Sequence, residues 1–163
     1  MAPLSEAQRG IVSTIREFVR RDVNPVAQQM EHDDEYPSEL VERMKELGLF
    51  GAIIPEEYGG LALDVSTYAL AIEEICRGWM SLSGILNSHL IMAYLVTTHG
   101  TKEQKEHYLP LMATGEKRGG ICITEPNAGS DVQAIETRAV REGDEYVVNG
   151  SKSLITNGRH GNT

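Results

Sequence analysis

The apolar pattern of this chain changes once, at about residues 114–120, and this change constrains the fold more than any other feature. Before it, apolar residues recur every three to four positions, which is typical of amphipathic helices. After Gly119, short β-branched runs alternate with Gly, Asn and Asp, which is typical of strands joined by tight turns. We therefore predict an α+β protein in which a helical unit, residues 1–118, precedes a β unit, residues 119–163.

The helical unit is expected to be a bundle whose helices have recognisable ends. Ser5 with Gln8, and Thr101 with Gln104, fit the capping-box pattern that begins a helix. Pro25 should end or bend the first helix, because proline lacks the backbone N–H that a helix interior needs. Later helices are expected at 37–47, 64–77, 81–98 and 101–109, with a packed loop at 47–63.

For two of these helices the sequence also predicts which residues are buried. One side of the helix at 64–77 should be buried, and it consists of Val65, Tyr68, Ala69, Ile72, Ile75 and Cys76. The helix at 81–98 is apolar over most of its circumference, which predicts a place in the middle of the bundle. His89 interrupts it. Because a buried polar side chain needs a partner, we expect a hydrogen-bonded core histidine rather than a catalytic one.

Charge and cysteine content argue against several classes of protein. A net charge of −9 disfavours a nucleic-acid partner. Cys76 and Cys122 lack the spacing of a metal site or a disulfide framework. The N-terminus lacks a signal-peptide pattern, and the stretch Leu82 to Val96 is interrupted by polar residues, so that it falls short of the roughly 20 apolar residues of a membrane helix. Together these features predict a cytoplasmic protein without a membrane or nucleic-acid partner.

The β unit is expected to hold four short strands. One ends at Thr124, a pair flanks a hairpin turn at Glu142–Glu145, and one carries Thr156. Because a few strands with open edges do not make an independent domain, we expect this unit to be incomplete within the sequence.

The segment ICITEPNAGSD, residues 121–131, holds the densest chemical signal. Thr124 places a hydroxyl at a strand end, where it can face the polar edge of a planar cofactor. Gly129 and Ser130 bring backbone N–H groups together in a turn, and such groups favour anions such as phosphate. A turn-rich loop without a ligand is the plainer interpretation, and the residues alone favour it.

A second segment, NGSKSLITNG at 149–158, has Asn-Gly at both ends of a short run. This arrangement is mostly typical of hairpins. Thr156 offers another hydroxyl for a cofactor contact, which by itself is a weak signal.

Taken together, TEPNAGSDV and YVVNGSKSLITNG resemble the flavin-binding signature of the acyl-CoA dehydrogenases. The stretches LGLFGAIIPEEYGG, IEEICRG and HGTKEQKEHYLPLMATGEKRGGICITEP are similar to that family in order and spacing, so the resemblance covers essentially the whole chain. It implies an N-terminal helical bundle followed by the first strands of a β-barrel domain, truncated within it. It also implies FAD, and oxidation of an acyl-CoA thioester to the 2,3-enoyl-CoA. A carboxylate base would remove the α-proton while the β-hydrogen leaves as hydride to the flavin.

Carried over by position, the resemblance assigns cofactor contacts to Ile121, Cys122, Ile123, Thr124, Gly129, Ser130, Leu154, Ile155 and Thr156. Thr156 would point toward flavin N5, and Thr124 would meet the polar edge of the ring. Such hydrogen bonds stabilise an electron-rich reduced flavin. Ser130 would also lie near the pantetheine arm of the substrate. Leu86 and Leu90 would contact the acyl chain, although plain core residues are an equally good interpretation of these two leucines.

Three departures from the family pattern matter. Leu154 stands where the family has a Trp packed on the flavin, so stacking is lost. Asn127 replaces a common Gly, and Asn tolerates positive φ. The catalytic Glu of the family lies beyond residue 163, and neither Glu125 nor Glu136 matches it. The 163-residue chain alone is therefore expected to be inactive and not to hold FAD tightly.

The resemblance also implies an acyl-CoA substrate, an electron-transfer flavoprotein as electron acceptor, a homo-oligomer (tetramer or dimer) and a role in fatty acid or amino acid catabolism. Two alternatives stay open. One is a flavin oxidase or monooxygenase-like relative of the same fold, which Leu154 motivates. The other is a non-catalytic partner subunit, which the missing base motivates.

Overall fold

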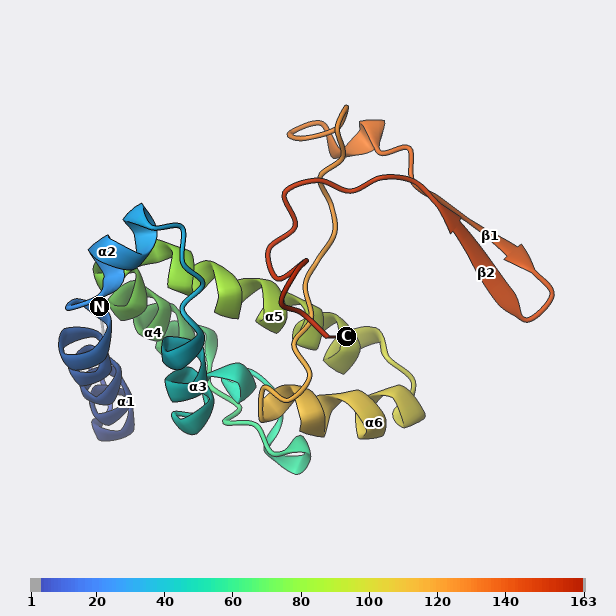
Figure 1. Ribbon diagram of the computed structural model, residues 1–163. Coiled ribbons are helices and arrows are strands. Elements are labelled where there is room, and N and C mark those ends of the chain that lie inside the picture. Colours follow the sequence, from blue (N-terminus) through green and yellow to red (C-terminus); the bar gives the residue numbers. More distant parts are fainter. Residues whose placement is uncertain (1–3, 163) are drawn as a thin grey trace.

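The computed structural model describes residues 4–162 and shows a helical bundle from which an irregular segment and a β-hairpin extend (Figure 1). Residues 1–3 of the predicted first domain and Thr163 of the second lie outside the described residues. The helices are α1 (Glu6–Phe18), the π-helix η1 (Val19–Val23), α2 (Ala27–His32), α3 (Ser38–Glu46), α4 (Val65–Gly78), α5 (Met80–His99) and α6 (Lys102–Ala113). Three short 3₁₀ turns are η2 (Leu49–Gly51), η3 (Glu56–Tyr58) and η4 (Val132–Ala134), and the strands are β1 (Arg138–Glu142) and β2 (Glu145–Asn149). The α+β class is confirmed.

Both predicted capping boxes are present. The Ser5 hydroxyl accepts a hydrogen bond from the backbone N–H of Gln8 (3.1 Å), and Thr101 does the same for Gln104 (3.3 Å). Each glutamine side chain in turn accepts from the backbone N–H of the capping residue. Local sequence therefore determines where α1 and α6 begin.

Pro25 marks a helix end as expected, and Gly48 marks another. The chain leaves α1 through the π-helix, turns at Pro25 and starts α2 two residues later. Gly48 follows α3 with φ +71°, a left-handed conformation that glycine adopts without a Cβ clash. The loop at 47–63 is packed as predicted, because Leu49, Phe50 and Ile54 are at most 3% exposed.

The predicted buried side of α4 is only partly correct. Ile75 is buried, but Val65 is 82% exposed. The residues of α4 that are buried include Thr67 and Glu74, and the Glu74 carboxylate accepts from the Arg16 guanidinium of α1 at 2.7 and 3.1 Å. Because a polar pair joins α1 and α4, apolar periodicity alone misplaced the buried face.

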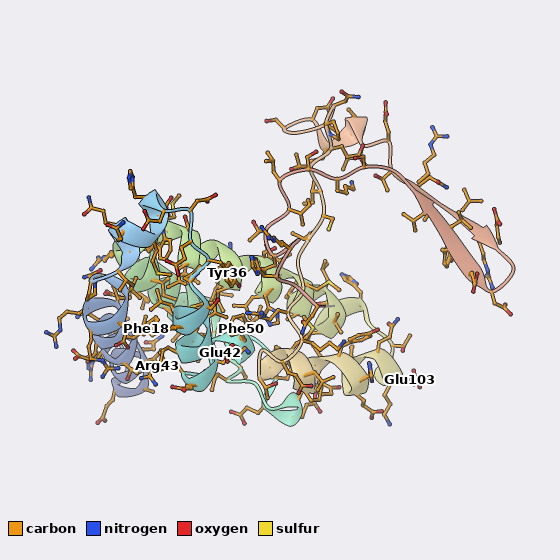
Figure 2. The ribbon with its side chains drawn as sticks, viewed as in Figure 1. Phe18, Tyr36, Glu42, Arg43, Phe50 and Glu103 are labelled. Carbon is orange, nitrogen blue, oxygen red and sulfur yellow. The ribbon has the colours of Figure 1, made fainter. Side chains whose placement is uncertain are left out.

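Helix α5 occupies the middle of the molecule, as predicted, and contacts α4, α6 and η2 (Figure 1). Figure 2 shows Phe18 and Phe50 among the side chains of the bundle interior, where they are 3% and 0% exposed. Leu86 and Leu90, each 1% exposed, belong to the buried residues of this helix. Contrary to the sequence-based expectation, α5 is long and apolar enough to cross a membrane by length and composition alone, a test that the core helix of a bundle also passes.

Helix α6 is longer than predicted. It continues through Pro110 to Ala113, although proline removes one backbone hydrogen bond. Leu109 and Met112 on either side of Pro110 are both 0% exposed. Burial of these side chains therefore holds the last turn of the helix in place.

Two of the four predicted strands are present. β1 and β2 pair antiparallel around a turn in which Gly143 has φ +65°, so the expected hairpin is confirmed. The segments that end at Thr124 and carry Thr156 are irregular within the described residues. A β-branched run forms a strand only where a neighbouring strand pairs with its backbone through a ladder of hydrogen bonds. Here each of the two segments lies beside α5 and beside the other segment, and no such ladder forms between them within the described residues.

We expect Leu86→Ala to lower the free energy of unfolding by about 2–5 kcal/mol, because it leaves a cavity in the packed core of the bundle. The matched control is Val65→Ala on α4, which removes an exposed side chain and should change stability by about 0.5 kcal/mol or less. Urea unfolding followed by circular dichroism measures both. Equal effects of the two substitutions would contradict this placement of Leu86.

Candidate functional site

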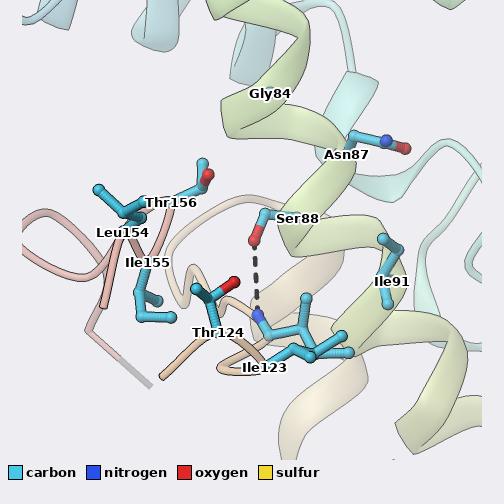
Figure 3. Close-up of a pocket in the computed structure, with 10 residues that line it drawn as sticks. Gly84, Asn87, Ser88, Ile91, Ile123, Thr124, Leu154, Ile155 and Thr156 are labelled. Carbon is cyan, nitrogen blue, oxygen red and sulfur yellow. Dashed lines mark hydrogen bonds between the residues drawn. The ribbon is translucent and has the colours of Figure 1, made fainter. Parts of the chain in front are cut away.

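A pocket of about 300 Å³ lies where α5 meets two segments that carry the flavin-binding signature (Figure 3). We call residues 121–131 the first segment and residues 149–158 the second segment. Its lining comprises Gly84, Asn87, Ser88 and Ile91 of α5, Ile121, Ile123 and Thr124 of the first segment, and Leu154, Ile155 and Thr156 of the second. The expectation that Thr124 and Thr156 meet at one site is therefore confirmed.

Backbone and side-chain hydrogen bonds join the two segments to each other. The backbone N–H of Ser153 donates to the carbonyl of Thr124 (2.9 Å). The Lys152 ammonium group donates to the carbonyl of Ile123 (3.0 Å) and to Glu125 Oε1 (2.8 Å). Irregular segments are thus held together without a sheet.

Glu125 is the centre of this arrangement. Its carboxylate, in a residue only 7% exposed, accepts from the backbone N–H groups of Glu136 (2.8 Å) and Thr137 (3.0 Å) and from the Thr137 hydroxyl. Hydrogen bonds from Lys152, then from Thr137 and the backbone, lower the pKa of Glu125 from 4.5 to about 2. A carboxylate so stabilised is a poor proton acceptor, which agrees with the expectation that Glu125 is not the catalytic base.

Two adjacent side chains of α5 attach the first segment to the bundle. The Ser88 hydroxyl accepts from the backbone N–H of Ile121 at 3.4 Å (Figure 3). His89 is 0% exposed, and its Nε2 lies 3.1 Å from the carbonyl oxygens of both Phe50 and Met112. Because carbonyls only accept, Nε2 carries the hydrogen, and Nδ1 accepts from the backbone N–H of Gly119 (3.4 Å).

Burial lowers the pKa of His89 to about 4, so the ring is neutral near pH 7. A neutral ring is what this geometry requires, since protonated Nδ1 would point a hydrogen at the N–H of Gly119. The prediction of a satisfied core histidine is confirmed.

The pocket combines apolar walls with unused hydrogen-bonding groups. Ile121, Ile123 and Ile155 supply apolar surface from both segments. Among residues 4–162, the hydroxyls and backbone N–H groups of Thr124 and Thr156 have no protein partner. This combination fits a flat ring that has apolar faces and a polar edge.

Leu154 lies at the rim of the pocket rather than over its centre. Its side chain is 93% exposed, and its φ of +56° is uncommon for a residue with a Cβ. The resemblance assigned Leu154 a cofactor contact, which stays a prediction, and the structure gives its side chain little contact with the rest of the described chain.

The remaining predicted site residues do not line this pocket. Cys122 is exposed, although its neighbours on both sides line the pocket. Gly129 and Ser130 lie exposed on the turn after Glu125, so their predicted contacts stay predictions. Leu86 and Leu90 lie in the core instead, and for these two the alternative interpretation as core residues is correct.

Sequence reasoning missed several residues that assemble the pocket. Gly84 of its lining and Lys152, which joins the two segments, carried no expectation, and Ser88 was only one of the unnamed polar residues that interrupt the stretch Leu82 to Val96. The useful signal was that interruption, because a polar group on a buried face needs a partner from another segment. Among the described residues, no cluster of three or more His, Cys, Asp and Glu side chains could hold a metal ion.

Comparison with known proteins adds family information. The chain matches the models of the acyl-CoA dehydrogenase N-terminal domain at residues 5–116 and of the middle domain at residues 120–163. A short-chain-specific acyl-CoA dehydrogenase of Clostridium acetobutylicum is 42% identical over 156 residues, which are 95% of this chain and 41% of that protein. The chain thus spans about two fifths of the length of the curated relatives it matches.

Solved structures agree in fold. The complex of glutaryl-coenzyme A dehydrogenase with glutaryl-CoA has a TM-score of 0.92 and 38% identity, and the match covers 99% of this chain and 42% of that one. An acyl-CoA dehydrogenase from Bacillus anthracis complexed with FAD has a TM-score of 0.83 and 36% identity over 93% of this chain and 27% of that one.

We expect the Glu125 carboxyl group to titrate with a midpoint near pH 2. Because its folded pKa is lowered, the ionised group stabilises this segment above about pH 4.5, and the stabilisation is lost as the pH falls through 2. A carboxyl-carbon NMR titration measures the midpoint. Lys152→Met should raise it, whereas Lys102→Met on α6 should not. A midpoint near 4.5 in the unaltered protein would contradict the prediction.

Proposed function

Because the chain belongs to the acyl-CoA dehydrogenase family, we propose that it forms part of the active site of an enzyme that oxidises an acyl-CoA thioester to the 2,3-enoyl-CoA. The observation that carries this proposal is the pocket itself. Two segments with the flavin-binding signature, about 30 residues apart in the sequence, supply its walls together with α5.

FAD is the cofactor that we assign to this pocket. Its isoalloxazine ring has apolar faces and a polar edge, and the isoleucine walls and the free groups of Thr124 and Thr156 fit these two features. When bound, FAD supplies the acceptor for the β-hydrogen of the thioester as a hydride.

The residues of this chain bind and tune that group. Hydrogen bonds donated by Thr124 and Thr156 to the polar edge stabilise negative charge on the ring, and so favour its reduced form. Ile121, Ile123 and Ile155 exclude water from its faces, which strengthens those hydrogen bonds. Ile91 and Gly84 line the pocket from α5, and we place the acyl group of the substrate beside them.

We assign no catalytic base to this chain. None of the residues that line the pocket has a side chain that titrates as an acid or base. The nearest carboxylate in sequence, Glu125, is paired with Lys152, and Glu136 uses only its backbone N–H at the site. We propose that a carboxylate outside the described residues removes the α-proton.

Further partners follow from the same proposal. We propose an electron-transfer flavoprotein as electron acceptor, a homo-oligomer in the cytoplasm, and a role in fatty acid or amino acid catabolism. Exposed apolar side chains support further association, namely Ile91, Tyr94 and Leu95 on α5 and Val140, Tyr146 and Val148 on the hairpin.

One observation favours a second candidate, a flavin oxidase or monooxygenase-like enzyme of the same fold. Leu154 is 93% exposed and covers little of the pocket, so oxygen would reach a bound flavin more easily than beneath a stacked aromatic ring. This alternative shares the pocket and differs in what reoxidises the flavin.

We expect the protein expressed from its gene to absorb in the visible range of a flavin, and to reduce an artificial electron acceptor with an acyl-CoA thioester. A colourless protein without this activity would rule out both candidates. The same preparation separates them, because reduction by substrate followed by exposure to air should give slow reoxidation for a dehydrogenase. Rapid reoxidation with formation of hydrogen peroxide would favour the oxidase.

Replacing either hydroxyl should weaken FAD binding. Each of Thr156→Val and Thr124→Val removes one hydrogen bond worth about 0.5–1.5 kcal/mol, which corresponds to a roughly 2- to 10-fold higher Kd. Thr98→Val, at an exposed site near the end of α5, is the matched control and should leave the Kd unchanged. Fluorescence titration with FAD measures the three variants. Equal Kd values would remove these hydroxyls from the binding site.

A further inference from the structure

The polar groups of Gly119 are used in an unusual way. This residue is buried where the helical bundle ends and the first segment begins. Its N–H donates to Nδ1 of His89, and its carbonyl accepts from Nδ2 of Asn157 at 3.2 Å. Side chains from two distant parts of the chain, His89 and Asn157, therefore supply the hydrogen-bond partners of both backbone polar groups of Gly119.

Asn157 extends this contact to α5. The same Nδ2 donates its second hydrogen to the carbonyl of Ile85 at 3.0 Å. One amide nitrogen thus connects α5, the first segment and the second segment, and both of its hydrogens are used. We call this set of contacts, made by Asn157 to Ile85 and Gly119, the Asn157 clamp.

The space around Gly120 shows how closely the three segments approach. A Cβ at this position would lie 2.7 Å from the carbonyl oxygen of Thr156 and 3.3 Å from Oγ of Ser88. Only glycine fits there without displacing one of them. The next residue, Ile121, and the residue before Asn157 both line the pocket, so the clamp lies directly beside it.

The residue type at 157 also calls for an explanation. Its φ is +65°, in the left-handed region where glycine is the usual residue. Asn tolerates this region, and a simple turn would need no more than that. The side-chain amide here has two acceptors on two other elements, which a glycine at the same φ lacks.

We propose that Asn157 is a positioning residue that fixes the distance between the α5 wall and the flavin-facing walls of the pocket. This inference rests on the proposed function, because it assigns the clamp to the flavin site. Loss of the amide frees the segment around Thr156 to move away from α5, and the groups that face the flavin edge lose their alignment.

The experiment compares two variants with the unaltered protein expressed from its gene. Asn157→Gly keeps the left-handed turn and removes the amide, and Asn157→Asp keeps the side-chain shape and removes both donated hydrogens. The matched control is Asn162→Ala. Asn162 also links distant backbone groups, since it accepts from the N–H of Arg118 and donates to the carbonyl of Glu116, but it does not line the pocket.

Two readouts are measured, namely hydrogen exchange of the backbone amides of residues 119–121 and FAD titration with the visible spectrum of the bound flavin. We expect both Asn157 variants to raise exchange and the Kd for FAD by roughly tenfold, and to shift the flavin bands. The control should change the FAD Kd and flavin bands by less than about twofold.

Any result that differs from these expectations overturns part of the proposal. Faster exchange with an unchanged Kd and spectrum would show a structural contact without a role at the flavin site, and unchanged exchange would show that the clamp does not hold the segment. If the unaltered protein fails to bind FAD, the proposed function fails, and the exchange data alone then decide whether the clamp exists.

Discussion

Burial of polar groups in the apolar helix α5 determines how the rest of the chain is attached. A buried donor or acceptor without a partner costs about 1–3 kcal/mol, so His89 and Ser88 must be satisfied. Their partners come from η2, α6 and the first residues after the bundle. Throughout residues 4–162 no buried side-chain nitrogen or oxygen is left without a hydrogen bond. The need to pair His89 and Ser88 therefore determines where residues 119–121, at the start of the second unit, attach to the bundle.

The pocket then depends on two independent sets of contacts. Glu125 and Lys152 hold the two segments to each other, while Ser88, His89 and Asn157 hold them to α5. Neither set uses a sheet ladder, although both segments are rich in β-branched residues. The two segments therefore line the pocket with irregular backbone, and the N–H groups of Thr124 and Thr156 stay free to meet a ligand, which suits a site for a ring with a polar edge.

The sequence-based predictions were accurate where the interactions join residues close in sequence, and less accurate where they join residues far apart in sequence. Helix starts at Ser5 and Thr101, the turn at Pro25 and the hairpin at Gly143 depend on neighbours within a few residues, and all were predicted correctly. The buried face of α4 was partly wrong because its Glu74 pairs with Arg16, 58 residues away. The leucines of α5 assigned to an acyl pocket proved to be core residues, since apolarity does not distinguish the two.

By itself, the sequence determined the order and type of the elements, the existence of two chemically distinctive segments and the family to which they belong. These depend on local propensity, capping and turn chemistry, which act through covalent neighbours. Only the tertiary structure decided which residues share a wall and which polar groups meet. Lys152 and Glu125, or Asn157 and Gly119, are separated by 27 and 38 positions, and nothing in local geometry selects one distant partner over another. That selection is made when the bundle packs and each buried polar group has to find a hydrogen bond.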